Sequence, residues 1–467
     1  RDRSPSRGLG DVYKRQMLTA LTAPAFAETW YIEDGDITIS AGKDGNDVTQ
    51  KGETTYGDKD TVITNHDKDK ASSNTVTIEA EDKDDKVEVT LKDLNIDASR
   101  GSEAAVSVTG KGDTNIELDG DNELKGGDRH AGLEHNQTVD GEGNVTSGKL
   151  TIQDDKNNAG SLTATGGQFA AGIGGASANA GQVTITGGTI TATGEDGAGI
   201  GGGQGNKGTN AGNADIEISG GTIEATGGYA SAGIGGGNWG DANIKITGDA
   251  VIKNATGGAF GAGIGGGGGG NGDVTISGNA KIENAQGGFT GSGIGGGNGA
   301  SGTVTIKDDS TVTATGGEAG TGIGGGYAGL GDVTIEGNTT VNATGGVGSA
   351  GIGGGVDSVN DAAGNGNKIT IKGNESGSPT VKAVGGGTNK ENQVFIGGAG
   401  IGSGAGDAKA NITLEGKVTI VAKAGEGNAA IGDRNGEQVF TGLDGSITRY
   451  DSEGNNITLP TDPGYPV

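Results

Sequence analysis

Short apolar segments separated by glycine-rich turns recur through most of this chain. In residues 182–186, Val183 and Ile185 would face one way and Thr184 the other, which is the alternation of a half-buried β-strand. Residues 189–193 alternate in the same manner, with Ile190 and Ala192 on the inward side. The pattern therefore predicts short strands joined by glycine turns.

A third apolar segment sets the period of the chain. It reads Ala-Gly-Ile-Gly-Gly-Gly around Ile200 and returns, almost unchanged, about every 30 residues. Its isoleucines are Ile173, Ile200, Ile234, Ile264, Ile294, Ile323, Ile352, Ile401 and Ile431. Three apolar segments per period fit one coil of a β-solenoid with a strand on each of three sides. We therefore predict an all-β parallel β-helix of about 11–12 coils, each with three strands and roughly 30 residues.

Stacking of the coils predicts where the core lies. Parallel coils about 4.8 Å apart would place each isoleucine over the next and form a buried aliphatic ladder. Burial of each isoleucine would contribute roughly 1.5–3 kcal/mol. Because Ala171 and Ile173 point inward, we expect Gly172, Gly174 and their equivalents to face outward. The expected result is a strip without side chains along one face of the rod.

The two ends of the chain depart from the repeat. Residues 1–16 resemble translated adapter sequence, and residues 17–27 resemble the end of a truncated secretory signal with small residues at Ala25 and Ala27. This signal predicts a secreted or cell-surface bacterial protein. No later segment has the roughly 20 apolar residues of a membrane span. Residues 446–467 are rich in proline, and we expect them to begin a linker to a further C-terminal segment.

The region between these ends divides into two parts. Residues 28–148 are predicted to hold an N-terminal cap and charged coils, in which Val106 and Leu133 take the place of the later isoleucines. Residues 149–445 are predicted to be regular glycine-rich coils.

The composition of the chain excludes several classes of function. The chain has 105 glycines, no cysteine and a formal net charge of −27. Nucleic-acid binding requires clustered Lys and Arg, so the charge argues against it, although it permits divalent cations. The absence of cysteine excludes disulfides, thiolate metal sites and thiol redox chemistry.

Aromatic residues gather beside the recurring isoleucines. They precede the isoleucine by four or five residues or follow it by four or five, at Phe169, Tyr229, Trp239, Phe260, Phe289 and Tyr327. Rings beside a glycine strip would suit the apolar faces of sugars, so these six residues are the candidate carbohydrate-binding residues. The alternative is that the rings only cover the corners of the coils.

Acidic residues open several of the first strands in a coil. Asp241, Asp273 and Asp332, together with Asp215 and Asp407, are expected to stack in one row. Stacked carboxylates repel unless a cation or solvent lies between them, so the first three are candidate Ca²⁺ ligands. The alternative is that they are solvated or cap turns. No other cofactor is expected.

Support for catalysis is thin. The only histidines are His66, His130 and His135, and the carboxylates recur coil by coil instead of forming one singular cluster. Residues 128–135 are the nearest approach to such a cluster, and a charged loop is the favoured interpretation of them. We therefore predict that the protein is not an enzyme.

The charged coils carry a family resemblance. Residues 87–96 through 115–122 resemble the carbohydrate-binding β-helix domains of clostridial secreted proteins, and the Gly-Ile-Gly-Gly-Gly units are similar to repeats of large surface proteins of gut Firmicutes. The resemblance implies a right-handed parallel β-helix, binding of plant cell-wall or acidic polysaccharides, and calcium. Two alternatives stay open, namely a structural stalk or protein-binding adhesin, and a polysaccharide lyase or hydrolase.

Overall fold

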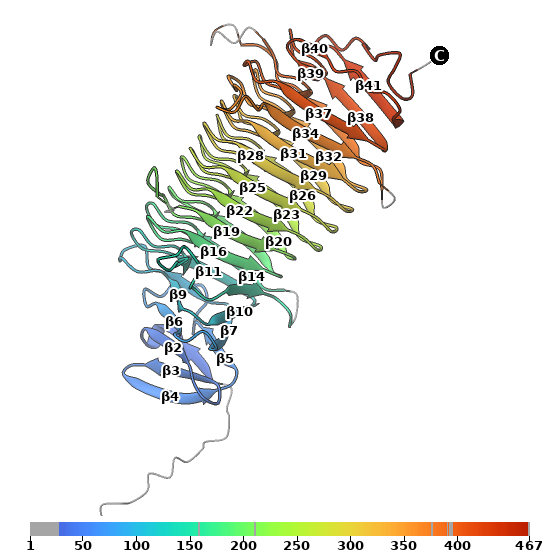
Figure 1. Ribbon diagram of the computed structural model, residues 1–467. Helices are drawn as coiled ribbons and strands as arrows, with labels where there is room; N and C mark the ends of the chain where they lie inside the picture. Colours follow the sequence, from blue (N-terminus) through green and yellow to red (C-terminus); the bar gives the residue numbers. More distant parts are fainter. Residues whose placement is uncertain are drawn as a thin grey trace, which may run out of the picture.

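Three long sheets run side by side along a rod, with the N-terminal coils at one end and the C-terminal coils at the other (Figure 1). This computed structural model describes residues 28–156, 159–209, 212–374, 377–389, 391 and 396–465. The predictions for residues 1–16 and 17–27 lie outside the described residues. The chain visits sheet A, then sheet C, then sheet B, and repeats this circuit coil after coil.

Sheet A has 13 strands. In spatial order they are β1 (Thr29–Tyr31), β5 (Thr61–Thr64), β7 (Lys86–Lys92), β10 (Asp113–Asp119), β13 (Leu150–Gln153), β16 (Gly181–Ile185), β19 (Ala214–Ile218), β22 (Ala242–Ile246), β25 (Gly272–Ile276), β28 (Gly302–Ile306), β31 (Gly331–Glu336), β34 (Asn367–Lys372) and β37 (Ala410–Glu415).

Sheet C has 12 strands. They are β8 (Asn95–Asp97), β11 (Asp121–Lys125), β14 (Ser161–Thr165), β17 (Thr189–Thr193), β20 (Thr222–Thr226), β23 (Val251–Thr256), β26 (Lys281–Gln286), β29 (Thr311–Thr315), β32 (Thr340–Thr344), β35 (Thr380–Val384), β38 (Lys417–Lys423) and β41 (Asp444–Tyr450).

Sheet B has 16 strands, many of them only an Ile–Gly pair. They are β4 (Glu53–Asp58), β3 (Asn46–Gln50), β2 (Ile37–Ala41), β6 (Val76–Ala80), β9 (Val106–Gly110), β12 (Leu133–His135), β15 (Ile173–Gly174), β18 (Ile200–Gly201), β21 (Ile234–Gly235), β24 (Ile264–Gly265), β27 (Ile294–Gly295), β30 (Ile323–Gly324), β33 (Ile352–Gly353), β36 (Ile401–Gly402), β39 (Ile431–Asp433) and β40 (Gly436–Glu437). One 3₁₀ turn, η1 (Ile32–Asp34), lies near the N-terminal end.

The predicted fold class is confirmed, because coil follows coil in parallel register in all three sheets. The rod has slightly more coils than the 11–12 expected, since sheet A alone has 13 strands. The additional coils belong to the charged N-terminal region, where the Gly-Ile-Gly signature is absent.

The predicted aliphatic ladder is also confirmed. Ile173 pairs with Ile200, Ile200 with Ile234, and the series continues to Ile431, with every member buried. Val106 and Leu133 extend the ladder toward the N-terminus in the places expected for them.

The expectation of an outward-facing glycine strip is wrong. Gly172 and Gly174 are buried, and a Cβ on Gly174 would collide with the carbonyl oxygen of Gly201 in the next coil. In addition, the segment that precedes the Ile–Gly pair of one coil is hydrogen-bonded to the segment that follows the Ile–Gly pair of a neighbouring coil. Gly268 N, for example, donates to Ala230 O at 2.7 Å. The glycines therefore allow tight stacking of backbone and do not form a surface.

Both ends of the rod are covered. At the N-terminal end the antiparallel strands β2, β3 and β4 close sheet B, and Trp30 Nε1 donates to Asp58 at 3.0 Å. At the other end β41 continues sheet C in register with β38, and the segment after it folds back so that Asp462 reaches Arg449. The expectation that residues 446–467 begin a linker is therefore wrong for the described residues, which end at 465.

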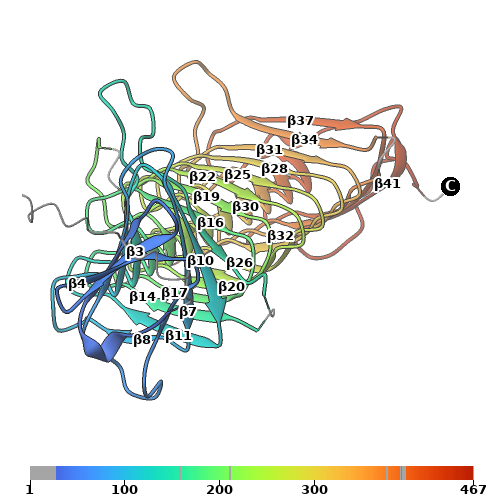
Figure 2. The same ribbon diagram turned by 90° about the horizontal axis from the view of Figure 1, so that it is seen from below.

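Two loops project from the rod where sheet B passes to sheet A (Figure 2). They are residues 136–149, drawn in teal, and residues 354–366, drawn in orange.

Candidate functional site

Three of the six predicted aromatic residues meet in one groove of about 380 Å³. Tyr229 and Phe260 stand before the Ile–Gly pairs of consecutive coils, and their ring centroids are 5.1 Å apart in an edge-to-face arrangement. Trp239 follows the Ile–Gly pair of the first of these coils and forms another wall. We call this site the aromatic groove.

Glycines make room for these rings. A Cβ on Gly269 would collide with the Trp239 ring, and a Cβ on Gly268 would lie 2.9 Å from Phe260 Cβ. These two glycines belong to the uninterrupted run 265–270 that follows Ile264. The Trp239 ring therefore packs directly on Gly269, and Gly268 contributes only backbone beside Phe260.

Trp239 adopts a backbone conformation that is unfavourable for a bulky residue. Its φ is +61°, and the equivalent positions of other coils also have positive φ, both at glycines (Gly269 and Gly299) and at residues with a side chain (Ala178, Ala328 and Asp357). Left-handed backbone costs about 1–2 kcal/mol for a residue with a Cβ, whereas glycine adopts it freely. The left-handed corner is therefore a feature of the repeat, and a tryptophan at this place puts a large ring at the groove.

Polar groups complete the lining. Gln204, Asn238 and Asn298 each stand four residues after the isoleucine of their coil, and all three are half-buried. Within the described part of the chain no hydrogen bond engages their side-chain amides. Asp196 supplies the one carboxylate of the lining. These residues were not predicted from the sequence, although the fixed distance of the amides from the isoleucine is a signal that could have identified them.

The other three predicted aromatics lie outside the groove. Arg129 lies over the Phe169 ring, 5.6 Å from its centroid, and Phe289 is 52% exposed. Tyr327 donates a hydrogen bond from its hydroxyl to Asp357 at 2.8 Å, and this bond raises the pKa of Tyr327. The six residues therefore do not form one continuous aromatic strip.

The predicted acidic row is interrupted. In sheet A, Asp215 pairs with Asn243, which pairs with Asp273, which pairs with Thr303, which pairs with Asp332. Carboxylates in alternate coils are about 9.6 Å apart, too far to share one cation.

Asp241 stands two residues before this row, so its expected alignment is wrong. Its carboxylate instead accepts hydrogen bonds from Asn271. Asp332 pairs with Lys368 at 3.2 Å. Among the described residues, no three His, Cys, Asp or Glu side chains gather closely enough to hold a metal ion.

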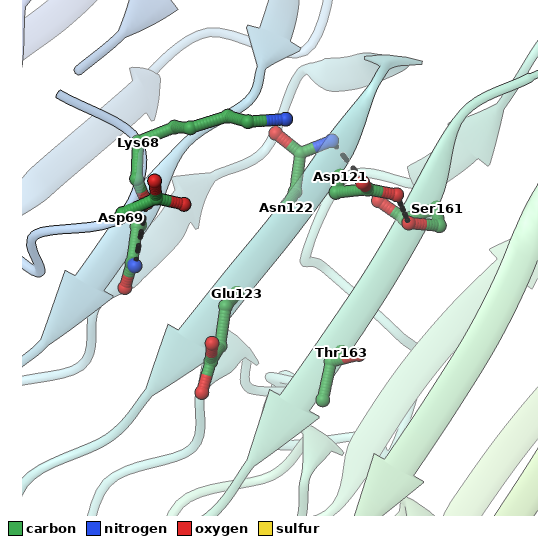
Figure 3. Close-up of a pocket in the computed structure, with 8 residues that line it drawn as sticks. Lys68, Asp69, Asp121, Asn122, Glu123, Ser161 and Thr163 are labelled. Atoms are coloured by element: carbon green, nitrogen blue, oxygen red, sulfur yellow. Dashed lines mark hydrogen bonds between the residues drawn. The ribbon is translucent and has the colours of Figure 1, made fainter. Parts of the chain in front are cut away.

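A second, polar pocket of about 440 Å³ lies over the N-terminal end of sheet C (Figure 3). Lys68 and Asp69 overhang it from one side, and strands β11 and β14 present Asp121, Glu123 and Thr163 on the other.

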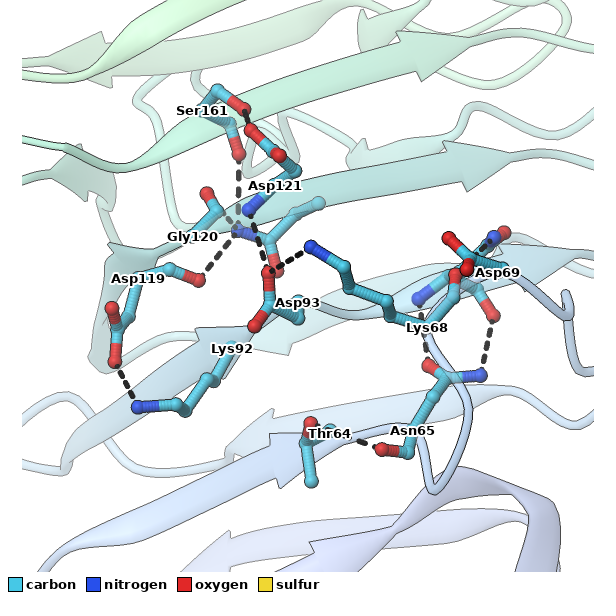
Figure 4. A network of polar contacts seen from close by, with 12 residues as sticks. Thr64, Asn65, Lys68, Asp69, Lys92, Asp93, Asp119, Gly120, Asp121 and Ser161 are labelled. Carbon is cyan, nitrogen blue, oxygen red and sulfur yellow. Dashed lines mark hydrogen bonds and ion pairs between the residues drawn. The ribbon is translucent and has the colours of Figure 1, made fainter.

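Most polar groups around this pocket already have partners (Figure 4). Lys68 pairs with Asp93 at 3.6 Å, and Asp93 also accepts the backbone N–H of Asp121 at 3.1 Å. Asp121 accepts the hydroxyl of Ser161 at 2.9 Å. The network fastens a loop to the sheet, in contrast to the unpartnered amides of the aromatic groove.

The charged segment 128–135 is also occupied with structural contacts. Buried Glu134 accepts from Asn136 at 2.9 Å and contacts His130 Nδ1 at 2.7 Å. Both ring nitrogens of buried His135 contact backbone carbonyl oxygens, those of Val108 and Gly148. These contacts tie β12 to its neighbours.

Comparison with known proteins agrees with the stacked coils. The family model described as Beta helix repeat matches residues 157–177, 183–204, 216–238, 304–327 and 333–356. The chain carries β-helix repeats. Neither the curated proteins nor the solved structures include a significant match to it. The matched segments include Asp196, Gln204, Tyr229 and Asn238 of the aromatic groove, whereas Trp239 and Phe260 lie outside them.

The described residues include no helix with the length and hydrophobicity that crossing a membrane requires.

Proposed function

We propose that this β-helix protein binds a carbohydrate chain in the aromatic groove and acts outside the cell, without catalysis. The proposal rests on one observation: exposed aromatic rings and side-chain amides without hydrogen-bond partners line the same groove. Tyr229 is 64% exposed, and the amides of Asn238 and Asn298 beside it have no hydrogen-bond partner among the described residues.

These two kinds of group match the apolar face and the hydroxyl groups of a sugar. Aromatic rings offer a large apolar surface at little cost in conformational entropy. A side-chain amide offers both a donor and an acceptor, which suits sugar hydroxyl groups that can also do both. Binding sites generally combine apolar walls with a few placed polar groups in this manner.

The first test replaces each ring by the residue that another coil already has at the equivalent place. The variants are Tyr229→Ala, matching Ala259, Phe260→Ala, matching Ala230, and Trp239→Gly, matching Gly269. We expect each variant to weaken glycan binding by about tenfold or more, because truncation of a central aromatic typically costs more than 1 kcal/mol. The measurement is isothermal titration of the full chain with polysaccharides that the parent protein binds.

Phe289→Ala is the matched control, since this ring is exposed but lies outside the groove. Its affinity should equal that of the parent. Unchanged affinity in all three groove variants would show that the site is misassigned. A parent protein that binds no glycan would leave the repeats as a stalk or adhesin surface.

A further inference from the structure

We propose that the aromatic groove selects uncharged glycans and holds the chain lengthwise along the rod. This inference rests on the proposed function and specifies its substrate class and direction.

The direction follows from the column of amides. Gln204, Asn238 and Asn298 occupy the same place in coils whose isoleucines, Ile200, Ile234 and Ile294, belong to one ladder. Consecutive coils are about 4.8 Å apart, so the column runs parallel to the rod axis and extends over about 14 Å. A ligand that contacts all three amides must therefore lie along the rod.

Gly268 keeps this path open. It holds the place of the amide in the coil between Asn238 and Asn298, and it contributes only backbone to the groove. A chain can thus pass from Asn238 to Asn298 over the backbone of Gly268 and the Trp239 ring that covers Gly269, with Tyr229 and Phe260 beside it.

The charge of the groove selects the substrate class. Asp196 is the one ionisable group of the lining apart from the Tyr229 hydroxyl, and no Lys or Arg lines the groove. A carboxylated or sulfated glycan would place its negative charge near Asp196, with no Lys or Arg in the lining to pair with it, which disfavours an anionic ligand. Lys207 is the cation recorded near the groove, stacked on the Trp239 ring with its Nζ 5.2 Å from the centroid. A sugar that packs on that face of Trp239 displaces Lys207.

The experiment measures affinities of the full chain for three neutral oligosaccharide series, of glucose, mannose and xylose, and for oligogalacturonides. We expect neutral oligomers of at least one series to bind, with affinity that rises with length until the chain spans the amide column. Lys207→Ala should leave this affinity unchanged or increase it, because the variant frees one face of Trp239.

Asn298→Gly tests the direction, and glycine is already present at the equivalent Gly268. We expect it to lower affinity about fivefold to tenfold for the longer oligomers and to leave the shorter ones unaffected, since only long chains reach both Asn238 and Asn298. Asn342→Ala on β32 is the control, because Asn342 is equally half-buried but lies in sheet C, away from the groove.

The outcomes distinguish failure of this inference from failure of the proposed function. Preferential binding of oligogalacturonides, weakened by Lys207→Ala, would overturn the inference while loss of binding in Trp239→Gly would still support the groove. Equal loss for short and long oligomers in Asn298→Gly would overturn the lengthwise arrangement. Binding that survives all three ring replacements, or no binding to any oligomer, would overturn both.

Discussion

Glycine has two distinct roles in this protein, and only the structure separates them. Gly235 has a φ of +137°, and a Cβ at this position would collide with Gly265 O in the next coil. Gly141, in a projecting loop, has no atom within 4 Å of the place where a Cβ would lie. At the first position the missing side chain is a condition for stacking, and at the second it is not.

We therefore expect Gly235→Ala to lower the free energy of unfolding by about 2 kcal/mol or more, through backbone strain and collision with the next coil. Gly141→Ala is the control and should change it by less than about 0.5 kcal/mol. Guanidinium denaturation of both variants measures the difference. Equal stability of the two would refute the explanation of the buried glycines.

At the scale of elements, one turn design recurs in three places. Asp140, Asp361 and Asp451 each accept the backbone N–H and the side-chain amide of an asparagine four residues later, Asn144, Asn365 or Asn455. A glycine with positive φ precedes each asparagine. The hydrogen bond from the asparagine side chain is the main cause that lowers the pKa of each aspartate.

The lowered pKa of the aspartate in this turn predicts how its contribution to folding stability depends on pH. Because the pKa of folded Asp361 lies below the ordinary 3.8, its stabilising contribution is present above that value and is lost as the pH falls through the folded pKa. Asn365→Ala should raise the pKa of Asp361 toward 3.8, measured by NMR titration of its carboxyl carbon. Asn455→Ala should shift Asp451 alone. No shift of Asp361 in Asn365→Ala would contradict this assignment.

At the scale of the molecule, the rod needs closed ends, because an uncovered coil exposes strand edges that pair with other chains. Arg449 closes the C-terminal end. Its side chain is fully buried, with Nε 2.7 Å from Asp462 and Nη1 2.5 Å from Glu437. This ion cluster joins β40 and β41 to the segment that folds back after them.

Arg449→Met should destabilise this end by about 3–5 kcal/mol, because it leaves the buried carboxylate of Asp462 and the partly buried one of Glu437 without their cation. Hydrogen exchange should accelerate in β38 and β41 and stay unchanged near Ile234, since coils of a solenoid contact only their neighbours. The control is Arg434→Met, which removes a largely exposed pair with Asp407 and should cost at most about 1 kcal/mol. Exchange that accelerates along the whole rod would contradict a local cap.

The sequence alone determined the repeating part of this protein. Identical residues at a constant spacing stack on one another when coils are parallel, so the ladder from Ile173 to Ile431 could be predicted from the period and the alternation of apolar positions. The fold class follows from the same local pattern.

The tertiary structure decided what depends on contacts between distant residues or on unequal loops. Alternation along a single strand suggested that Gly174 faces outward, but the backbone of the next coil occupies that space. Trp239 meets Tyr229 and Phe260 only because corners of neighbouring coils pack together, and Arg449 finds Asp462 only because the chain folds back. Periodicity specifies which residues stack, whereas the direction of each corner is set by packing against its neighbours.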